Sequence, residues 1–412
     1  MPFGIYDTDG TVRLTLAPNS GFCGLYAPDG SIYYTEVTAG STFYGSLAAN
    51  GSLNVINATG STTIGRYDPN GSIRVTTLNE NNGALRVSGF SLTPIVSVNW
   101  LTTPSVPAWL SFNRADATTR ATYFNSSGNL TTVTSATDPR FDYDRPTLNP
   151  QGLLIEPAFT NLILQSNYSA SWTTSRATIT ANNTSGITGT NTAGTFIEDA
   201  TASNTHVSSS TVTFAAGSTY IIGSVFKAKG RDWVALRFPA SAFTSALTAY
   251  FDLQNGVVGS VTSPATSGIV NLGGGWYYCW TKATATASIA ASAQVFVASA
   301  DGAVIYNGDN TSGIYISHAQ CGIATLRPSI VNTAGASVAR AADVLSQVTY
   351  GANAQIWQRK DFVTGTVDRI YYDPGSAPVT LPTGYWYQGA AVYSRALTAP
   401  EQIAKLVVNS AY

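Results

Sequence analysis

Residues 138–166 read DPRFDYDRPTLNPQGLLIEPAFTNLILQS and divide the chain into two regions of different character. Short repeats rich in turn residues precede this stretch, and a long region of strand-like composition follows it. The steps Asp142–Pro146 and Asn149–Gly152 are turn signals, because proline restricts φ while glycine and asparagine tolerate positive φ. Gly152–Glu156, which reads GLLIE, then predicts a short buried strand.

Composition predicts an all-β fold with several domains. A chain of 412 residues is long enough for two to four domains. Its 44% hydrophobic and 11% aromatic residues indicate packed structure, and the abundance of Thr, Ser, Val, Tyr and Gly favours strands. The 21 Lys and Arg residues against 22 Asp and Glu leave no basic excess, so we expect no nucleic-acid partner.

The cysteines and the N-terminus bear on the cellular compartment. Cys23, Cys279 and Cys321 are too few for a disulfide scaffold and are expected to be buried thiols, although pairing of Cys279 with Cys321 stays open. The first residues, MPFGI, lack the basic and apolar parts of a signal peptide. No run of about 18 apolar residues occurs, so we expect no membrane insertion.

Residues 1–90 contain a repeat of about 20 residues, with copies that begin at Gly4, Gly24, Gly45 and Gly65. Each copy carries Asp-Gly or Asn-Gly between alternating apolar residues, which is the pattern of a β-hairpin with a type I′ turn. A single hairpin cannot bury its apolar face, so the copies must stack on one another or on other subunits. Two interpretations stay open: a compact β-domain within one chain, and an oligomeric shaft or docking arm.

Two further regions complete the predicted domain order. Residues 91–159 are predicted to form a linker and β-hairpins, with a strand at Ala108–Phe112. Residues 160–330 predict one β-sandwich of the jelly-roll type, because short strands recur at even spacing with turns between them. The strands expected in it are 177–180, 211–214, 219–227, 233–238, 248–252, 275–281, 293–298 and 313–318.

Residues 331–412 are predicted to form a C-terminal β segment that ends in a short helix. Residues 356–359 and 369–374 are strand-like, and Thr398 with Glu401 forms a capping box ahead of a 3–4 apolar spacing. The segment is short for a complete sandwich. We therefore expect strands from 90–160 to complete it around the module at 160–330.

The quoted stretch resembles a segment of bacteriophage and prophage virion proteins of the head-spike and tail-fibre type. The resemblance lies in the order of Arg140-Phe-Asp-Tyr-Asp, Gly152-Leu-Leu-Ile-Glu and Phe159-Thr-Asn-Leu, where Phe159 replaces the usual Arg. Further matching segments, at 111–123, 319–325 and 338–343, extend it over roughly residues 105–345. Residues 160–330 are also similar in layout to carbohydrate-binding modules, and the C-terminal ending is similar to laminin-G and concanavalin-like lectin sandwiches.

This resemblance implies a non-enzymatic virion appendage: a head fibre, a capsid decoration spike or a tail fibre. It implies attachment to phage capsid or tail proteins through the N-terminal repeats, assembly as a homotrimer, and adhesion to host-surface glycans. It brings no catalytic motif with it. Two alternatives stay open, a polysaccharide-degrading tailspike and a secreted carbohydrate-binding adhesin, although the missing signal peptide speaks against the second.

Glycan binding would use aromatic faces for stacking and polar groups for orientation. The aromatic candidates are Trp172, Trp233, Trp276, Tyr277, Trp280, Tyr385 and Trp386. Strand alternation places Trp276, Tyr278 and Trp280 on one face and Tyr277 and Cys279 on the other, so that one set must be core.

Few residues offer catalytic or metal chemistry. A glycosidase needs two carboxylates roughly 5–9 Å apart. We expect turn or capping roles for the carboxylates available, which are Glu156, Glu198, Asp199, Asp252, Asp301 and Asp309. Asp252, Asp301 and Asp309 are also the candidates for Ca²⁺, and no other cofactor is expected. His206 and His318 are isolated in the sequence, so no zinc site is predicted.

Overall fold

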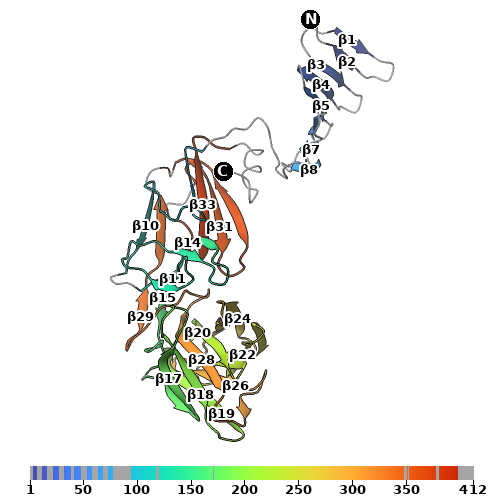
Figure 1. Cartoon of the computed structure of the whole chain (residues 1–412). Helices are drawn as coiled ribbons and strands as arrows, with labels where there is room; N and C mark the ends of the chain where they lie inside the picture. The colour runs from blue at the N-terminus through green and yellow to red at the C-terminus, as the bar shows by residue number, and fades with distance from the viewer. Residues whose placement is uncertain are drawn as a thin grey trace.

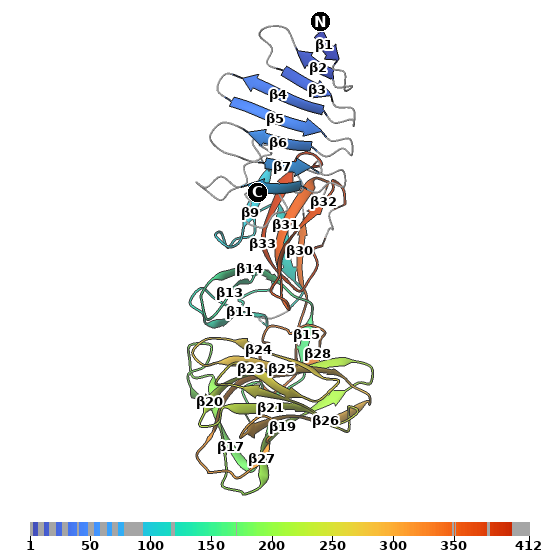
Figure 2. The same ribbon diagram turned by 90° about the vertical axis from the view of Figure 1, so that its right-hand side faces the viewer.

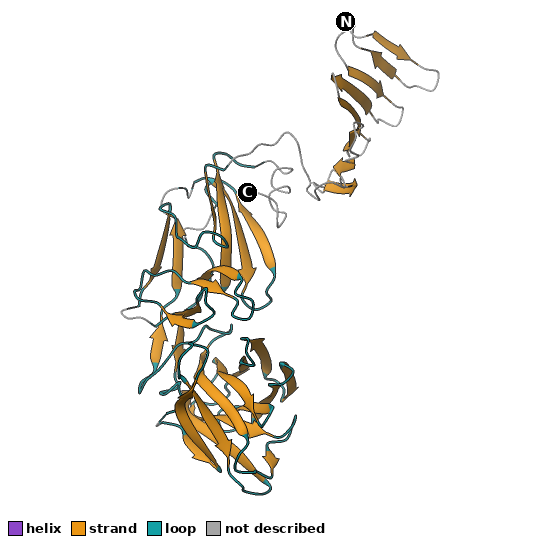
Figure 3. Ribbon diagram, in the orientation of Figure 1, coloured by secondary structure: helices purple, strands orange, loops and turns teal. Residues whose placement is uncertain are grey.

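The structure, a computed structural model, describes residues 94–116, 120–169, 171–347, 350, 352–376 and 380–397, and the backbone of eight strands among the first 77 residues. Every regular element in these parts is a β-strand, which confirms the all-β prediction (Figure 3). The described residues contain no helix long and apolar enough to cross a membrane. The short helix predicted after Thr398 lies outside the described residues.

The N-terminal repeats form four β-hairpins joined edge to edge in one antiparallel sheet (Figure 1). Each repeat supplies one hairpin, as its Asp-Gly or Asn-Gly step predicts. Ladders between successive hairpins then continue the sheet from repeat to repeat. Its strands are β1 (Phe3–Tyr6), β2 (Val12–Thr15), β3 (Phe22–Tyr26), β4 (Ile32–Thr38), β5 (Ser41–Leu47), β6 (Leu53–Asn57), β7 (Ile64–Tyr67) and β8 (Ile73–Thr77).

Residues 173–323 form a sandwich of two antiparallel sheets, which we call the inserted sandwich (Figure 2). One sheet runs in the order β16 (Thr173–Ser175), β19 (Asn204–Phe214), β26 (Ile289–Ala298), β21 (Trp233–Phe238), β22 (Leu247–Asp252) and β23 (Val257–Val261), with β27 (Ile305–Tyr306) beside β19. The other runs β17 (Ala177–Thr184), β18 (Ala193–Glu198), β28 (Gly313–Ile323), β20 (Thr219–Lys229), β25 (Tyr277–Thr284) and β24 (Thr266–Asn271). All eight predicted strands are present, together with five that were not predicted.

The core of the inserted sandwich lies between its two sheets. On β21 the alternate residues Val234, Leu236 and Phe238 are completely buried in it. Cys279 and Cys321 lie in the same core as free thiols, so the pairing left open by the sequence does not occur.

Segments before and after this module together form a second sandwich, which we call the split sandwich. Its main sheet runs β13 (Phe141–Tyr143), β14 (Pro150–Ile155), β33 (Tyr385–Tyr393), β31 (Ala354–Asp361) and β32 (Val367–Tyr372), with β9 (Val96–Asn99) also beside β33. The pair β10 (Leu110–Arg114) and β30 (Asp343–Gln347) covers one face, and β11 (Thr122–Phe124) forms a hairpin with β12 (Leu130–Thr132). Leu110, Leu153, Trp357 and Tyr387 belong to the shared core.

Strand β33 joins the two ends of this region. Leu153 on β14 pairs with Tyr387, and Val98 on β9 pairs with Ala390, while β31 occupies the other edge of β33. Strands from 90–160 therefore complete the C-terminal sheet, as the short C-terminal segment required. The linker predicted at the start of residues 91–159 is wrong for Val96–Asn99, whose apolar and polar residues alternate as a strand requires.

The inserted sandwich leaves and re-enters the split sandwich at one place. There β15 (Phe159–Asn161) pairs with β29 (Val338–Arg340) in antiparallel register. Figure 1 shows both strands between the two sandwiches, and Figure 2 shows β15 there in the turned view.

Candidate functional site

The stretch at 138–166 contributes to a buried cluster of charges beside the candidate site. Arg140 donates to the Glu156 carboxylate at 2.6 Å and also to Asp343, which accepts from Arg114 Nε at 2.8 Å. Arg340 lies 3.6 Å from Glu156, and all five side chains are buried. These five residues come from three of the segments that carry the family resemblance, so those motifs meet at one point in the fold.

The cluster holds the Glu156 carboxylate in the charged form. Burial works to raise the pKa of Glu156, but Arg340 and Arg140 outweigh it and lower the pKa to about 2. The Ser329 N–H also donates to Glu156 at 2.7 Å. Glu156, one of the carboxylates considered for glycosidase chemistry, is therefore a structural ion-pair partner.

The two sandwiches meet through an apolar junction. Leu130 on β12 and Ile330 after β28 pack with Tyr278 on the outer face of β25 and with Trp276, which directly precedes that strand. Trp276 is only 5% exposed there, and Tyr278 is buried. The face of β25 opposite the inserted core is thus covered by the neighbouring module rather than by solvent.

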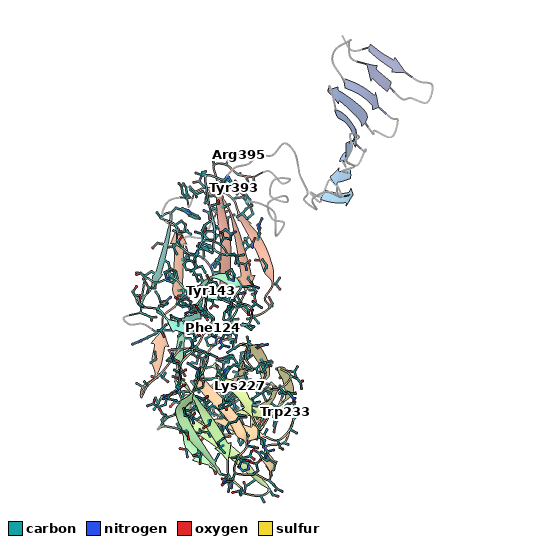
Figure 4. All side chains as sticks on the ribbon, viewed as in Figure 1. Phe124, Tyr143, Lys227, Trp233, Tyr393 and Arg395 are labelled. Carbon is teal, nitrogen blue, oxygen red and sulfur yellow. The ribbon has the colours of Figure 1, made fainter. Side chains whose placement is uncertain are left out.

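A cavity of about 150 Å³ opens beside this junction and is lined from both sandwiches. Aromatic side chains line much of it: Tyr123, Phe124, Tyr143, Tyr278, Phe362 and Trp386. Figure 4 labels Phe124 and Tyr143 at the level where the two sandwiches meet. The charged residues in the wall are Asp142, Asp144, Arg145, Arg327 and Lys360, with the amides of Gln151 and Asn271. Its volume matches that of cavities that hold a molecule of benzene size.

Asp142 is the buried carboxylate of the cavity wall. Its Oδ1 accepts the Phe124 N–H at 2.8 Å, and its Oδ2 accepts Trp386 Nε1–H at 2.9 Å. Burial raises the pKa of Asp142 to about 6, although these two hydrogen bonds and the nearby Arg140 act against the rise. Asp142 is therefore an acceptor that fixes Trp386 at the cavity wall.

Arg327 differs from the other cations of the wall, Arg145 and Lys360, because it makes no hydrogen bond among the described residues. Its guanidinium lies 4.3 Å from the centre of the Phe362 ring and 5.6 Å from that of Tyr278. Among the described residues no carboxylate oxygen lies within ion-pair distance of it and no hydrogen bond holds it. Burial lowers the pKa of Arg327, because the charged form loses solvation. Arg327 and Phe362 also line a second cavity, of about 240 Å³, next to Glu156 and Arg340.

Of the seven aromatic residues predicted for glycan binding, Trp386 alone lines the 150 Å³ cavity. Its neighbour Tyr385 points to the opposite face of β33, where Arg359 lies 4.0 Å from its ring centre. Trp276 is buried in the junction, which leaves it no face for a sugar. Trp280 is partly buried at the same junction, and Tyr277 packs against the inserted core.

The other two aromatic candidates lie on the inserted sandwich away from the cavity. Trp172 packs 4.3 Å from Tyr168 between ring centres, and its Nε1 donates to the Gln165 carbonyl at 2.7 Å. Trp233 packs beside a small buried group on the outer face of β21 that includes Phe296. Figure 4 shows Trp233 on the side of the inserted sandwich, apart from Phe124 and Tyr143.

The remaining carboxylate candidates are engaged in local structure. Glu198 accepts from Arg231 at 2.5 Å and from the Tyr306 hydroxyl at 2.6 Å. Asp199 accepts the Thr201 N–H. Hydrogen bonds from the side chain and backbone of Ser312, and then from Thr311, hold the pKa of Asp309 well below its usual range.

The calcium candidates do not converge in the described part of the chain. Asp252 accepts from Gln254 and Asn255 of its own turn, and Asp301 accepts from Ser260. Like that of Asp309, each carboxylate thus already accepts hydrogen bonds from protein donors. Within the described residues no group of three or more Asp, Glu, His and Cys side chains is arranged to hold a metal ion.

The two histidines are buried and lie in separate places. Burial lowers the pKa of His318 to about 4, so that the ring is neutral at pH 7. His206 Nδ1 lies 2.7 Å from the Arg176 carbonyl and its ring packs against Tyr306. Neither residue lines the 150 Å³ cavity.

Sequence reasoning missed most of the cavity. The sequence places Asp142 in a predicted turn, and no local pattern marks Arg327 or Lys360. The one local signal is Phe141-Asp-Tyr143, where a single carboxylate sits between aromatic residues on a short strand. Comparison with protein-family models finds no matching family, and comparison with curated proteins finds no matching relative.

Proposed function

We propose that this chain is a non-enzymatic bacteriophage virion appendage that binds host-surface glycans in the cavity between its two sandwiches. The observation that carries the glycan part is the wall of that cavity, where six aromatic side chains stand beside charged and amide groups. Sugar rings offer an apolar face to the aromatic groups and hydroxyls to the polar ones. A cavity of about 150 Å³ suits one ring of a saccharide chain rather than a long segment.

The virion part of the proposal is supported by the resemblance and by the N-terminal sheet. The resembling motifs supply the buried cluster around Arg140 and Asp343, so they describe an architecture rather than a catalytic centre. The hairpin sheet at residues 3–77 offers backbone edges and faces through which copies could join each other and the particle. We propose that it docks on capsid or tail proteins and holds the chain as a homotrimer. Repetition on a particle would make a weak glycan site effective through its high local concentration.

Immunogold labelling tests the location. Particles from the source are labelled with an antibody against residues 160–330. Gold over the capsid indicates a head fibre or decoration spike, and gold at the tail tip indicates a tail fibre. Absence of gold from every particle contradicts the virion proposal and favours the secreted adhesin.

Binding of the full chain to an array of bacterial surface glycans tests the adhesion. Tyr143→Ala removes an aromatic wall of the cavity and is expected to weaken binding about tenfold, while Trp233→Ala, outside the cavity, leaves it unchanged. Equal loss in both variants would contradict a site at this cavity. Release of new reducing ends from a bound polysaccharide would contradict the non-enzymatic assignment and support a tailspike.

A further inference from the structure

The cavity wall carries more positive than negative charge. Arg145, Arg327 and Lys360 face two carboxylates, those of Asp142 and Asp144. No carboxylate forms an ion pair with Arg327 among the described residues, and the charges of Asp142 and Glu156 act on it from a longer distance. The pocket therefore has a surplus of about one positive charge at neutral pH.

The three cations differ in how far their donors are already used. Arg145 donates to the carbonyls of Leu272 and Gly273 on the rim. Lys360 donates to the neutral Gln151 amide and lies 5.4 Å from the Trp386 ring centre. Among the described residues, Arg327 contacts aromatic rings and makes no hydrogen bond. Its N–H donors are therefore free to bind a ligand. A half-buried guanidinium without a direct ion-pair partner or hydrogen bond is costly, so a bound anion would gain most by pairing there.

Taken together, these contacts lead us to propose that the saccharide bound in this cavity is acidic, with a carboxylate that pairs with Arg327. The inference rests on the proposed glycan binding and names its ligand class. A planar guanidinium held against Phe362 presents parallel N–H groups, which match a carboxylate in bidentate geometry. One surplus charge also suits a monoanionic uronic or sialic acid better than a phosphate dianion, which would face Asp142 and Asp144 as well.

The test compares acidic saccharides with their neutral counterparts on the full chain. Titration calorimetry is run with oligosaccharides of galacturonic, glucuronic and N-acetylneuraminic acid, with matched galactose and glucose oligosaccharides, and with galactose 6-phosphate. We expect at least one carboxylated saccharide to bind ten or more times more tightly than its neutral counterpart. Binding should weaken several-fold between 50 and 500 mM salt (~tenfold change in ionic strength), because the pairing is electrostatic.

Variants at two arginines locate the effect. Arg327→Gln should reduce binding of the acidic saccharide to the level of the neutral one, and Arg327→Lys should recover part of the loss. Arg176→Gln is the matched control, because Arg176 is an exposed arginine on the inserted sandwich that does not line the cavity. Thermal unfolding of each variant confirms that the fold is intact.

The outcomes separate the two proposals. Binding of neutral saccharides with no acidic preference, or an acidic preference that survives Arg327→Gln, overturns the inference and leaves glycan binding in place. Stronger binding of galactose 6-phosphate than of any carboxylated saccharide overturns the choice of carboxylate. Absence of binding for every saccharide overturns the glycan function itself.

Discussion

The backbone at position 152, in the GLLIE strand, accepts only glycine. Its φ is +115°, and a Cβ atom at this position would lie 2.3 Å from the Tyr387 carbonyl oxygen on the neighbouring strand β33. Gly152→Ala should therefore destabilise the protein by about 3 kcal/mol or more, through both backbone strain and overlap. Gly217→Ala is the matched control, because Gly217 also has a positive φ of +79° but no atom within 4 Å of the added Cβ. Equal losses of stability in denaturant titrations would show that overlap with β33 plays no part.

Asp142 gives stability an unusual dependence on pH. The folded pKa, about 6, lies above the usual 3.8, so its stabilising contribution is complete below pH 3.8 and is lost as the pH rises through 6. The difference between the folded pKa and the usual pKa of Asp142 corresponds to roughly 3 kcal/mol of stability. Glu156 acts in the opposite sense. Its folded pKa, about 2, lies below the usual 4.5, so its stabilising contribution is complete above pH 4.5 and is lost as the pH falls toward 2.

The contribution of Asp142 is measured as a difference between wild type and Asp142→Asn. From pH 7 to pH 4 the wild type should gain stability relative to the variant, whose side chain does not titrate. Chemical denaturation at several pH values measures the two curves. Parallel curves over this range would show that Asp142 ionises normally in the folded protein.

At the scale of single elements, β25 shows how one strand serves two interiors. Cys279 faces the core of the inserted sandwich, while Tyr278 faces the junction with the split sandwich. Trp276, which precedes the strand, is buried in the same junction. The sequence predicted correctly that the two faces alternate and that one set is core. The structure adds that the second module covers the other face, so that this face is not free for a ligand.

Truncation of Trp276 should consequently affect stability rather than glycan recognition alone. Trp276→Ala removes a side chain that is 5% exposed and should destabilise the fold by about 3–5 kcal/mol. Trp233→Ala, at a half-buried position outside the junction, should cost clearly less. The midpoints of thermal unfolding compare the two, and a small effect of Trp276→Ala would argue against a tightly packed junction.

Strand prediction succeeded where apolar residues alternate and failed where they do not. The hairpin repeats and the long strands β19, β20 and β28 have clear alternation or apolar runs. Strand β16 has only polar residues, and in β23 (VVGSV) and β24 (TSGIVN) Gly and Ser interrupt short apolar runs. All their positions are exposed or half-buried, so no clear alternation marks these three strands in the sequence. Tertiary pairing with their neighbours decides their conformation.

The cavity could not be predicted from local patterns. Its wall combines residues from both ends of the split sandwich with others from β24, β25 and the loop after β28. Asp142 and Arg327, for example, are brought together only by the docking of the two modules. Trp386 could be predicted because an aromatic residue beside Tyr385 is a candidate for sugar stacking whatever the fold.

At the scale of the whole molecule, the buried charges hold together parts of the chain from both sides of the insertion. Asp343 accepts from Arg114 and Arg140 and from the Glu156 N–H. Asp343→Asn leaves buried arginines without compensation and should destabilise the fold by about 3–5 kcal/mol. Asp368→Asn serves as control, since the carboxylate that pairs with Arg359 is 49% exposed and should contribute about 0–1 kcal/mol. Denaturant titration of both variants measures whether the buried ion pairs of Asp343 contribute more to stability than the exposed pair of Asp368.

The pairing of β14 with β33 also governs the order in which the chain can fold during its synthesis. Leu153 and its partner Tyr387 are 234 positions apart, as the difference of their numbers gives. At about 5–20 residues per second, the ribosome needs roughly 10–50 s to reach the second strand after making the first. The inserted sandwich is complete by then, because all its strands lie in between. The nascent chain therefore contains a complete inserted sandwich while the apolar strand GLLIE is still unpaired. During this interval chaperones would have to protect that strand.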